Sequence, residues 1–378
     1  MAVVGIIFSN IHNNDIPELT TQRTMASIPY GCRYRLIDFH LSNMVNANIT
    51  KIGIITHNNY HSLIDHLSTG KDWDLARRNG GITILSPFLQ SGSSGFGQLY
   101  NTRLEALLSI DYYVNQCEEE YVVLSDSDIV CNVDIKDMIR QHRKSEADIT
   151  IATKRLTISN ENPDKHTIIL ADDTGRITGV QYSSPTTVYQ GEYDVNMNIW
   201  VMKTRLLVKM ISNAHARGLK SFTRDLIAPS LDSLNIRQYR YESFYASINS
   251  MSDYYNNNMA LLKKANRVAL FDVENRPVYT KIRNSSPTYY SNDSQVKNSL
   301  IADGCRILGT VENSIIFRGV HIGKNAVVKN SILMQDTYVC PDTSLNCVIT
   351  DKNVVIKEGR NLSGHPTKPF FIEKNSTI

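Results

Sequence analysis

Residues 311–334 read VENSIIFRGVHIGKNAVVKNSILM, and this stretch decides the fold of the last part of the chain. Aliphatic residues recur in it at every sixth position, namely Ile316, Ile322, Val328 and Met334. The period continues less regularly in pairs such as Ile349 and Val355. A six-residue apolar period is typical of a parallel β-helix, whereas an antiparallel β-sandwich would show sustained alternation by two. The stretch therefore predicts a left-handed parallel β-helix of hexapeptide repeats over residues 290–378.

The residues before the predicted β-helix follow a different pattern, in which short apolar runs alternate with helical ones. Runs rich in β-branched residues at Val3–Phe8 and Tyr121–Ser125 predict strands, and Arg103–Gln116 predicts an amphipathic helix. Strands that alternate with helices indicate a Rossmann-like α/β domain with a mainly parallel sheet over residues 1–265. Residues 266–289 carry apolar side chains and two prolines, so we expect a packed linker there.

Composition and charge exclude several classes of function. The 378 residues include 40 basic and 37 acidic side chains, so neither nucleic acid nor a membrane surface is an expected partner. Six cysteines without a CxxC pair are typical of reduced thiols in a cytosolic protein. The N-terminus lacks the basic segment of a signal peptide, and no stretch approaches the roughly 20 apolar residues that span a bilayer. We therefore expect a cytoplasmic protein.

A second stretch, PYGCRYRLIDFHLSN at Pro29–Asn43, connects the first domain to a known family. It resembles the PFGGKYRIIDFxLSN segment of the glucose-1-phosphate adenylyltransferases, also called ADP-glucose pyrophosphorylases. Ile52–Asp65, Asn196–Leu207 and Phe222–Pro229 resemble later segments of that family, so the resemblance covers almost the whole chain. It implies a GT-A-like nucleotidyltransferase domain followed by a β-helix. It also implies a role in making ADP-glucose and pyrophosphate from ATP and glucose 1-phosphate for glycogen synthesis.

The loop after the first predicted strand departs from that family. Ligands of α/β sheets bind beyond the carboxyl ends of the strands, where active members carry a GGGxGTR loop and this chain has SNIHNND, Ser9–Asp15. A phosphate-binding loop needs converging backbone amides and often a positive φ, which glycine allows. Asp15 falls at the arginine that would face the triphosphate. At 4 Å and an effective dielectric constant near 20, this exchange turns an attraction of roughly 4 kcal/mol into repulsion.

Four further positions that carry chemistry in the family are also altered. The family's RAKP and EKP lysines and the first acid of its DFGKD segment are replaced, and so is its metal-binding acid. The residues at these positions are Met25, Ser184, Ser221 and Ser127. In the active family, magnesium held by two carboxylates bridges the nucleotide phosphates while cations neutralise the transferred group. We therefore expect no intact catalytic set, no bound cofactor and no metal in this chain.

The pattern resembles the regulatory, GlgD-type subunits of the family. Such a chain would join a catalytic subunit in a hetero-oligomer, expected to be a tetramer, in which the partner binds Mg²⁺ and ATP. A small-molecule effector such as a sugar phosphate is a further expected ligand. The resemblance places Arg33 near the family's effector site, and Arg35 is the second candidate, although both can equally form ordinary structural ion pairs.

Two alternatives remain open at this point. The chain can be an active adenylyltransferase with an atypical phosphate loop, in which Asp126, Asp128 and Asp225 provide a shifted magnesium site. It can also be an acyltransferase, because hexapeptide β-helices often carry that chemistry, with His321 as the base. A solvent-facing histidine at a corner of the helix explains His321 equally well.

Overall fold

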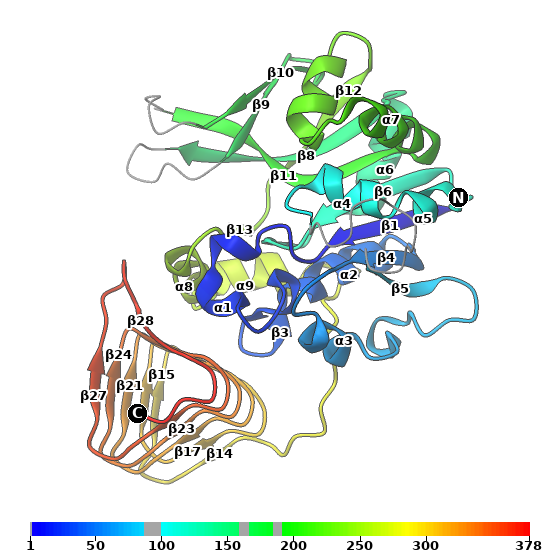
Figure 1. The fold of residues 1–378 in the computed structure, drawn as a ribbon. Helices are drawn as coiled ribbons and strands as arrows, with labels where there is room; N and C mark the ends of the chain where they lie inside the picture. Colours follow the sequence, from blue (N-terminus) through cyan, green and yellow to red (C-terminus); the bar gives the residue numbers. More distant parts are fainter. Residues whose placement is uncertain (1, 87–99, 159–165, 184–190) are drawn as a thin grey trace.

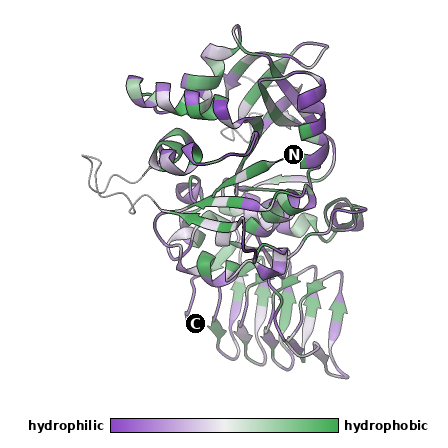
Figure 2. Ribbon diagram, turned by 90° about the vertical axis from the view of Figure 1, so that its right-hand side faces the viewer, coloured by the Kyte–Doolittle hydropathy of each residue, from purple (hydrophilic) through white to green (hydrophobic). Residues whose placement is uncertain are grey.

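The computed structural model describes residues 2–86, 100–158, 166–183 and 191–378 (Figure 1). A layered α/β domain comes first, and a coil of short parallel strands follows it. In Figure 2 hydrophobic residues concentrate on the strands of both domains, whereas the turns between them are mostly hydrophilic.

Nine strands of the described residues form one mixed sheet in the first domain. β1 lies between β4 and β6, and these three strands are parallel, as is the next strand, β5. On the other side of β6 the long strand β11 runs antiparallel and pairs with β8 and β9. The bounds are β1 (Val3–Phe8), β4 (Lys51–Ile55), β5 (Gly81–Leu85), β6 (Tyr121–Asp126), β8 (Ile149–Ile158), β9 (Thr167–Ala171), β10 (Ile177–Tyr182), β11 (Gly191–Lys203) and β12 (Ile236–Tyr241). The predicted α/β core is confirmed, and β11 extends it with strands that run the opposite way.

Helices cover both faces of this sheet. Alternate side chains of β1 enter opposite cores. Ile6 packs with α4 (Arg103–Ser109) and α7 (Thr204–Arg217) on one face of the sheet. Ile7 packs with α2 (Leu36–Asn46) on the other face. The remaining helices are α1 (Pro17–Thr20), α3 (His61–Leu67), α5 (Asp111–Asn115), α6 (Ile135–Lys144), α8 (Met251–Ala260) and α9 (Lys264–Phe271). The prediction of a single helix over Arg103–Gln116 is wrong, because two helices occupy this range. Ile110 has a non-helical conformation, with φ −120° and ψ 20°, and separates α4 from α5.

The last part of the chain is a left-handed parallel β-helix, as predicted. Its wall consists of three parallel sheets, and each sheet contains five strands of the described residues. The first sheet contains β14 (Tyr289–Tyr290), β17 (Arg306–Ile307), β20 (His321–Ile322), β23 (Tyr338–Val339) and β26 (Val355–Ile356). The second contains β15 (Gln295–Lys297), β18 (Thr310–Glu312), β21 (Val327–Lys329), β24 (Ser344–Asn346) and β27 (Asn361–Ser363). The third contains β16 (Leu300–Ile301), β19 (Ile315–Ile316), β22 (Ile332–Leu333), β25 (Val348–Thr350) and β28 (Phe370–Ile372).

The coils of this β-helix are shorter than three full hexapeptides. Arg306 pairs with His321, fifteen residues on, and His321 pairs with Tyr338, seventeen residues on. A strict six-residue period therefore does not follow the coils. The period predicts that Val355, six residues after Ile349, points into the core of the β-helix, and this prediction is wrong. Ile356 is fully buried there, whereas Val355 is 36% exposed.

The two domains share one apolar core. β2 (Pro29–Tyr30) and β3 (Tyr34–Arg35) form a hairpin beside α1, and β7 (Ile129–Cys131) pairs with β13 (Tyr245–Ser247). Side chains of this region pack with α8 and with the outer face of the third sheet of the β-helix. Met25 of the first domain and Ile332 of the β-helix belong to this cluster, and both are buried. α9 runs across position 265, where the sequence places the end of the first domain; the predicted boundaries remain a prediction.

One ion pair crosses this apolar interface. A terminal guanidinium nitrogen of Arg23 donates to both carboxylate oxygens of Asp351 at 2.8 and 2.7 Å. The two side chains are only 2% and 5% exposed. A buried pair adds little net stability when formed, but removal of one partner leaves a buried charge without its counterion.

The substitution Asp351→Asn is therefore expected to lower the free energy of unfolding by about 3–5 kcal/mol. Urea denaturation of the purified chain measures this change. The matched control is Asp74→Asn, which removes the exposed pair of Asp74 with Arg77 and is expected to cost about 1 kcal/mol or less. Equal effects of the two substitutions would show that the buried pair does not hold the domains together.

Candidate functional site

The site lies at the carboxyl ends of β1 and β6. The loop after β1 contains a single 3₁₀ turn, Asn13–Asp15, and residues 9–15 contain no residue with positive φ. Three of its amides are already paired, since the N–H groups of Ser9, Asn13 and Asp15 donate to backbone carbonyls. The loop thus has a defined conformation without a left-handed residue.

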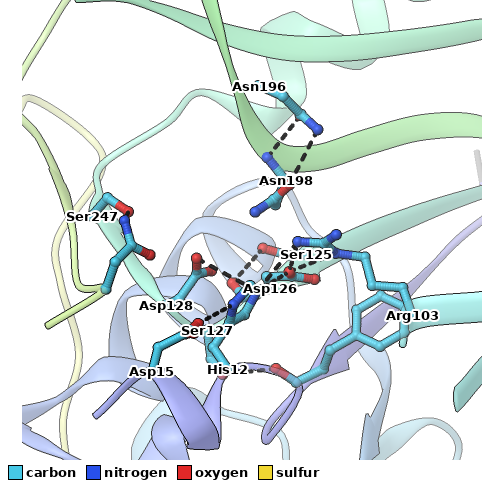
Figure 3. A network of polar contacts seen from close by, with 12 residues as sticks. His12, Asp15, Arg103, Ser125, Asp126, Ser127, Asp128, Asn196, Asn198 and Ser247 are labelled. Carbon is cyan, nitrogen blue, oxygen red and sulfur yellow. Dashed lines mark hydrogen bonds and ion pairs between the residues drawn. The ribbon is translucent and has the colours of Figure 1, made fainter. Parts of the chain in front are cut away.

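Side chains of opposite charge fill the space in front of this loop (Figure 3). His12 donates from Nε2 to Asp126 Oδ2 at 2.8 Å and from Nδ1 to Asp15 Oδ2 at 3.0 Å. Nε of Arg103, the first residue of α4, donates to the same oxygen of Asp126 at 2.6 Å. Asp128 Oδ2 lies 3.6 Å from His12 Nε2. Two cations therefore face three carboxylates, and Asp126 is fully buried between them.

The electrostatic environment keeps His12 charged. Burial by itself lowers the pKa of His12, but Asp128 and the hydrogen bonds to Asp126 and Asp15 raise it to about 10. Burial raises the pKa of Asp126, and Arg103 and His12 outweigh that effect and lower it. The pKa of Asp128 is raised, because burial and the neighbouring Asp126 carboxylate oppose its ionisation. At neutral pH His12 is thus an imidazolium that neutralises Asp126.

The structure places the altered family positions as follows. Asp15 is part of the ion-pair network and does not extend freely toward a ligand. Ser127 points away from Asp126 and Asp128 and donates to the carbonyl of Phe8 at 2.7 Å. Met25 is buried in the core between the domains.

The remaining predicted residues lie elsewhere. Ser221 caps the π-helical turn Phe222–Ile227, and Asp225 accepts the N–H groups of Lys220 and Ser221, so Asp225 does not join Asp126 and Asp128. Ser184 lies outside the described residues. The sequence analysis did not identify His12 or Arg103 as site residues. For His12 the only signal was the exchange of the family's glycine loop for one that contains a histidine.

The effector candidates Arg33 and Arg35 do not line this site. Arg33 is exposed, with its guanidinium carbon 5.7 Å from the centre of the Tyr34 ring. Arg35 is buried and donates to Ser62 Oγ at 3.0 Å. The role of Arg35 in effector binding stays a prediction.

A polar cavity of about 310 Å³ opens in front of the ion-pair network. Beyond His12, Asp15, Arg103 and Asp128, its lining includes neutral groups such as Asn196, Asn198 and Ser247. Asn198 has φ +56°, a left-handed conformation that asparagine tolerates better than most residues. None of the described lining residues is a lysine. The cavity therefore suits neutral polar groups better than a triphosphate.

The His12 network predicts a pH dependence of stability. Because the folded-state pKa of His12 lies above its ordinary value of 6.5, its contribution is fully present below pH 6.5. It is lost as the pH rises toward about 10. In metal-free buffer the native chain should exceed His12→Gln in free energy of unfolding by more than about 1 kcal/mol at pH 6, the equivalent of one pKa unit. This difference should fade by pH 10. A difference that stays constant over this range would contradict an imidazolium at His12.

Comparison with known proteins extends these observations. The profile of the nucleotidyl transferase family matches residues 16–261, and that of the GlmU-like C-terminal hexapeptide family matches residues 286–368. No helix within the described ranges is both long and apolar enough to cross a membrane.

Relatives of similar length include both catalytic and other proteins of glycogen metabolism. The glycogen biosynthesis protein GlgD of Bacillus subtilis (strain 168) is 32% identical over 98% of this chain and 96% of its own. The glucose-1-phosphate adenylyltransferase of Halalkalibacterium halodurans is 30% identical over 86% of this chain and 84% of its own. That of Acetivibrio thermocellus is 27% identical over 100% of this chain and 88% of its own. Together with the fold, these similarities show that the chain belongs to the glucose-1-phosphate adenylyltransferase family of nucleotidyl transferases, in which it is similar to GlgD.

Proposed function

We propose that this chain is a catalytically degenerate, regulatory subunit that modulates the adenylyltransferase reaction of a catalytic partner. The partner would form ADP-glucose and pyrophosphate from ATP and glucose 1-phosphate for glycogen synthesis. One observation carries the proposal, namely that His12 and Arg103 neutralise Asp126 from within the protein. The carboxylate that ends β6 is thus paired with the protein's own cations.

The charges of the site oppose a bound triphosphate. With its carboxylates ionised, the network of Asp15, Asp126, Asp128, His12 and Arg103 carries a formal charge of −1. Each pair of like charges about 4 Å apart costs roughly 4 kcal/mol at an effective dielectric constant near 20. The lysine that the family resemblance predicts as a compensating cation is replaced by Met25, whose side chain is 1% exposed.

Magnesium with nucleotide does not fit the residues present. Magnesium needs oxygen ligands in octahedral geometry and shares them with the nucleotide phosphates. Here one oxygen of Asp126 accepts hydrogen bonds from both His12 and Arg103. Three of the loop amides, those of Ser9, Asn13 and Asp15, donate to backbone carbonyls and do not face a phosphate. We therefore derive no catalytic step through magnesium in this chain.

The purified chain alone is expected to form ADP-glucose at least about 10³-fold more slowly than a catalytic relative, since loss of one transition-state contact typically costs 10²–10³ in rate. The assay measures pyrophosphate release from ATP, glucose 1-phosphate and Mg²⁺. When this chain is mixed with the catalytic subunit from the same cell, a complex should appear in size-exclusion chromatography with light scattering. The maximal velocity or the effector response of that complex should differ from those of the catalytic subunit alone.

The control for this experiment is the catalytic subunit mixed with an unrelated protein of similar size. Turnover by the isolated chain within tenfold of the relative would support the alternative of an active enzyme with an atypical loop. Absence of any complex would overturn the regulatory role and the expected hetero-tetramer.

We also propose that a phosphate-bearing effector binds near Lys352, at the boundary between the domains. Burial, together with the positive charges of Arg35, Arg23 and Arg283, lowers the pKa of Lys352 to about 6 against the opposing effect of Asp351. Three arginines with one nearby carboxylate favour a bound anion, which would in turn favour the charged form of Lys352. Arg35 thus contributes to this site through its charge, while its hydrogen bonds go to Ser62.

A sugar bisphosphate should raise the melting temperature of the chain, and Lys352→Gln should weaken its apparent affinity at least about tenfold, the expected loss of one charged hydrogen bond. The matched control is Lys357→Gln, an exposed lysine on the same β-helix. Equal affinities of the two variants would place any effector elsewhere, for instance at Arg33.

A further inference from the structure

Three potential metal-ligand side chains converge in front of β6. His12, Asp126 and Asp128 each offer one ligand atom, and these atoms all lie within 4.8 Å of one another. The described part of the chain contains no second group of three such side chains with this spacing. His12 comes from the loop after β1 and the two aspartates from the end of β6, so the group connects two neighbouring strand ends (Figure 3).

A second observation points to a missing ligand. Oδ1 of Asp126 and Oδ1 of Asp128 have no hydrogen-bond partner among the described residues, although the two side chains are 0% and 2% exposed. Nearly all buried carboxylate oxygens accept hydrogen bonds or bind ions. Two buried oxygens without a partner in one site therefore favour a positively charged ligand there.

The charge of the site indicates which group fits. Asp15, Asp126, Asp128 and Arg103 together carry a formal charge of −2. A proton on His12 compensates half of this charge, whereas a divalent cation compensates all of it. Such an ion would take the place of the proton on Nε2, so that one proton leaves as the ion binds.

The ligand types and distances favour a transition metal over magnesium. Bond lengths of 2.0–2.2 Å place the ligands of a tetrahedral zinc ion about 3.4 Å apart. His12 Nε2 lies 3.6 Å from Asp128 Oδ2 and 2.8 Å from Asp126 Oδ2, so the contact with Asp126 has to lengthen when an ion replaces the proton. An imidazole nitrogen suits zinc and its first-row neighbours, whereas magnesium prefers oxygen alone. Asp15 accepts a hydrogen bond from Nδ1 of His12 at 3.0 Å, the arrangement in which a carboxylate orients a metal-binding histidine.

We propose that His12, Asp126 and Asp128 bind one divalent transition-metal ion of the zinc class, with Asp15 as the positioning residue for His12. Water from the adjoining cavity would complete the coordination. The ion would tie the loop after β1 to the end of β6, while Arg103 keeps its hydrogen bond to Oδ2 of Asp126. Its role is structural, and the proposal is independent of whether the chain regulates a catalytic partner.

The test uses the full chain, stripped with a chelator and then titrated with Zn²⁺ by isothermal calorimetry. We expect one tightly bound ion per chain that millimolar Mg²⁺ does not displace. His12→Asn and Asp128→Asn should each weaken binding at least about 100-fold. Asp15→Asn should weaken it by about 10–100-fold, as is typical when the orienting partner of a ligand is lost. Asp225→Asn, an acid outside the group, should leave the affinity unchanged.

The six free cysteines are the competing ligands, and cobalt distinguishes them. Co²⁺ added to the native chain should give visible bands of nitrogen and oxygen coordination. A thiolate charge-transfer band would place the ion on cysteine and overturn the proposal, even if a variant fails to fold. Absence of binding by the native chain, or equal binding by Asp128→Asn and Asp225→Asn, would overturn it as well.

Discussion

The buried carboxylate of Asp126 is the charge around which the pocket is organised. An ionised group without exposure to water loses several kcal/mol of hydration, so it must be paired. His12 and Arg103 approach it from two elements that are distant in sequence, the loop after β1 and the start of α4. Since Asp15 then pairs with His12, the ion pairs hold the loop in one conformation. The loop after β1 therefore has a defined conformation although it contains no glycine.

Buried charges have to be paired at the interface between the domains as well. Arg23 is buried among apolar side chains and is compensated by Asp351 alone, while Lys352 nearby lies among further cations. Met25, two residues after Arg23, is part of the apolar core that joins the β-helix to the first domain. A methionine at this position adds apolar surface to the shared core without burying a charge.

The sequence allowed prediction of the architecture but not of the contents of the site. The six-residue period of residues 311–334 was sufficient to predict the β-helix, since Ile316, Ile322 and Val328 share its core, although Met334 lies in the core between the domains. It failed at Val355, since coils of fifteen and seventeen residues shift the register. The resemblance identified the family groups that are missing, such as the loop glycines and the lysine replaced by Met25. It did not identify their replacements, because His12 and Asp126 are 114 positions apart and no local pattern relates them.

The strands that position the site, β1 and β6, also contribute side chains to the hydrophobic cores. Alternate residues of β1 and β6 fill the hydrophobic clusters on both faces of the sheet, and the loop between β1 and α1 leads directly into the interdomain core. Substitutions at these core positions would create cavities at a cost of about 2–5 kcal/mol each, whereas exchanges of polar residues at the strand ends cost little if charges remain paired. Core packing therefore limits substitutions in the strands and helices, and the pairing of buried charges limits substitutions in the site. Neither constraint requires that a nucleotide can bind. A chain under these two constraints retains the fold of the adenylyltransferase family, while the polar residues at its strand ends can differ.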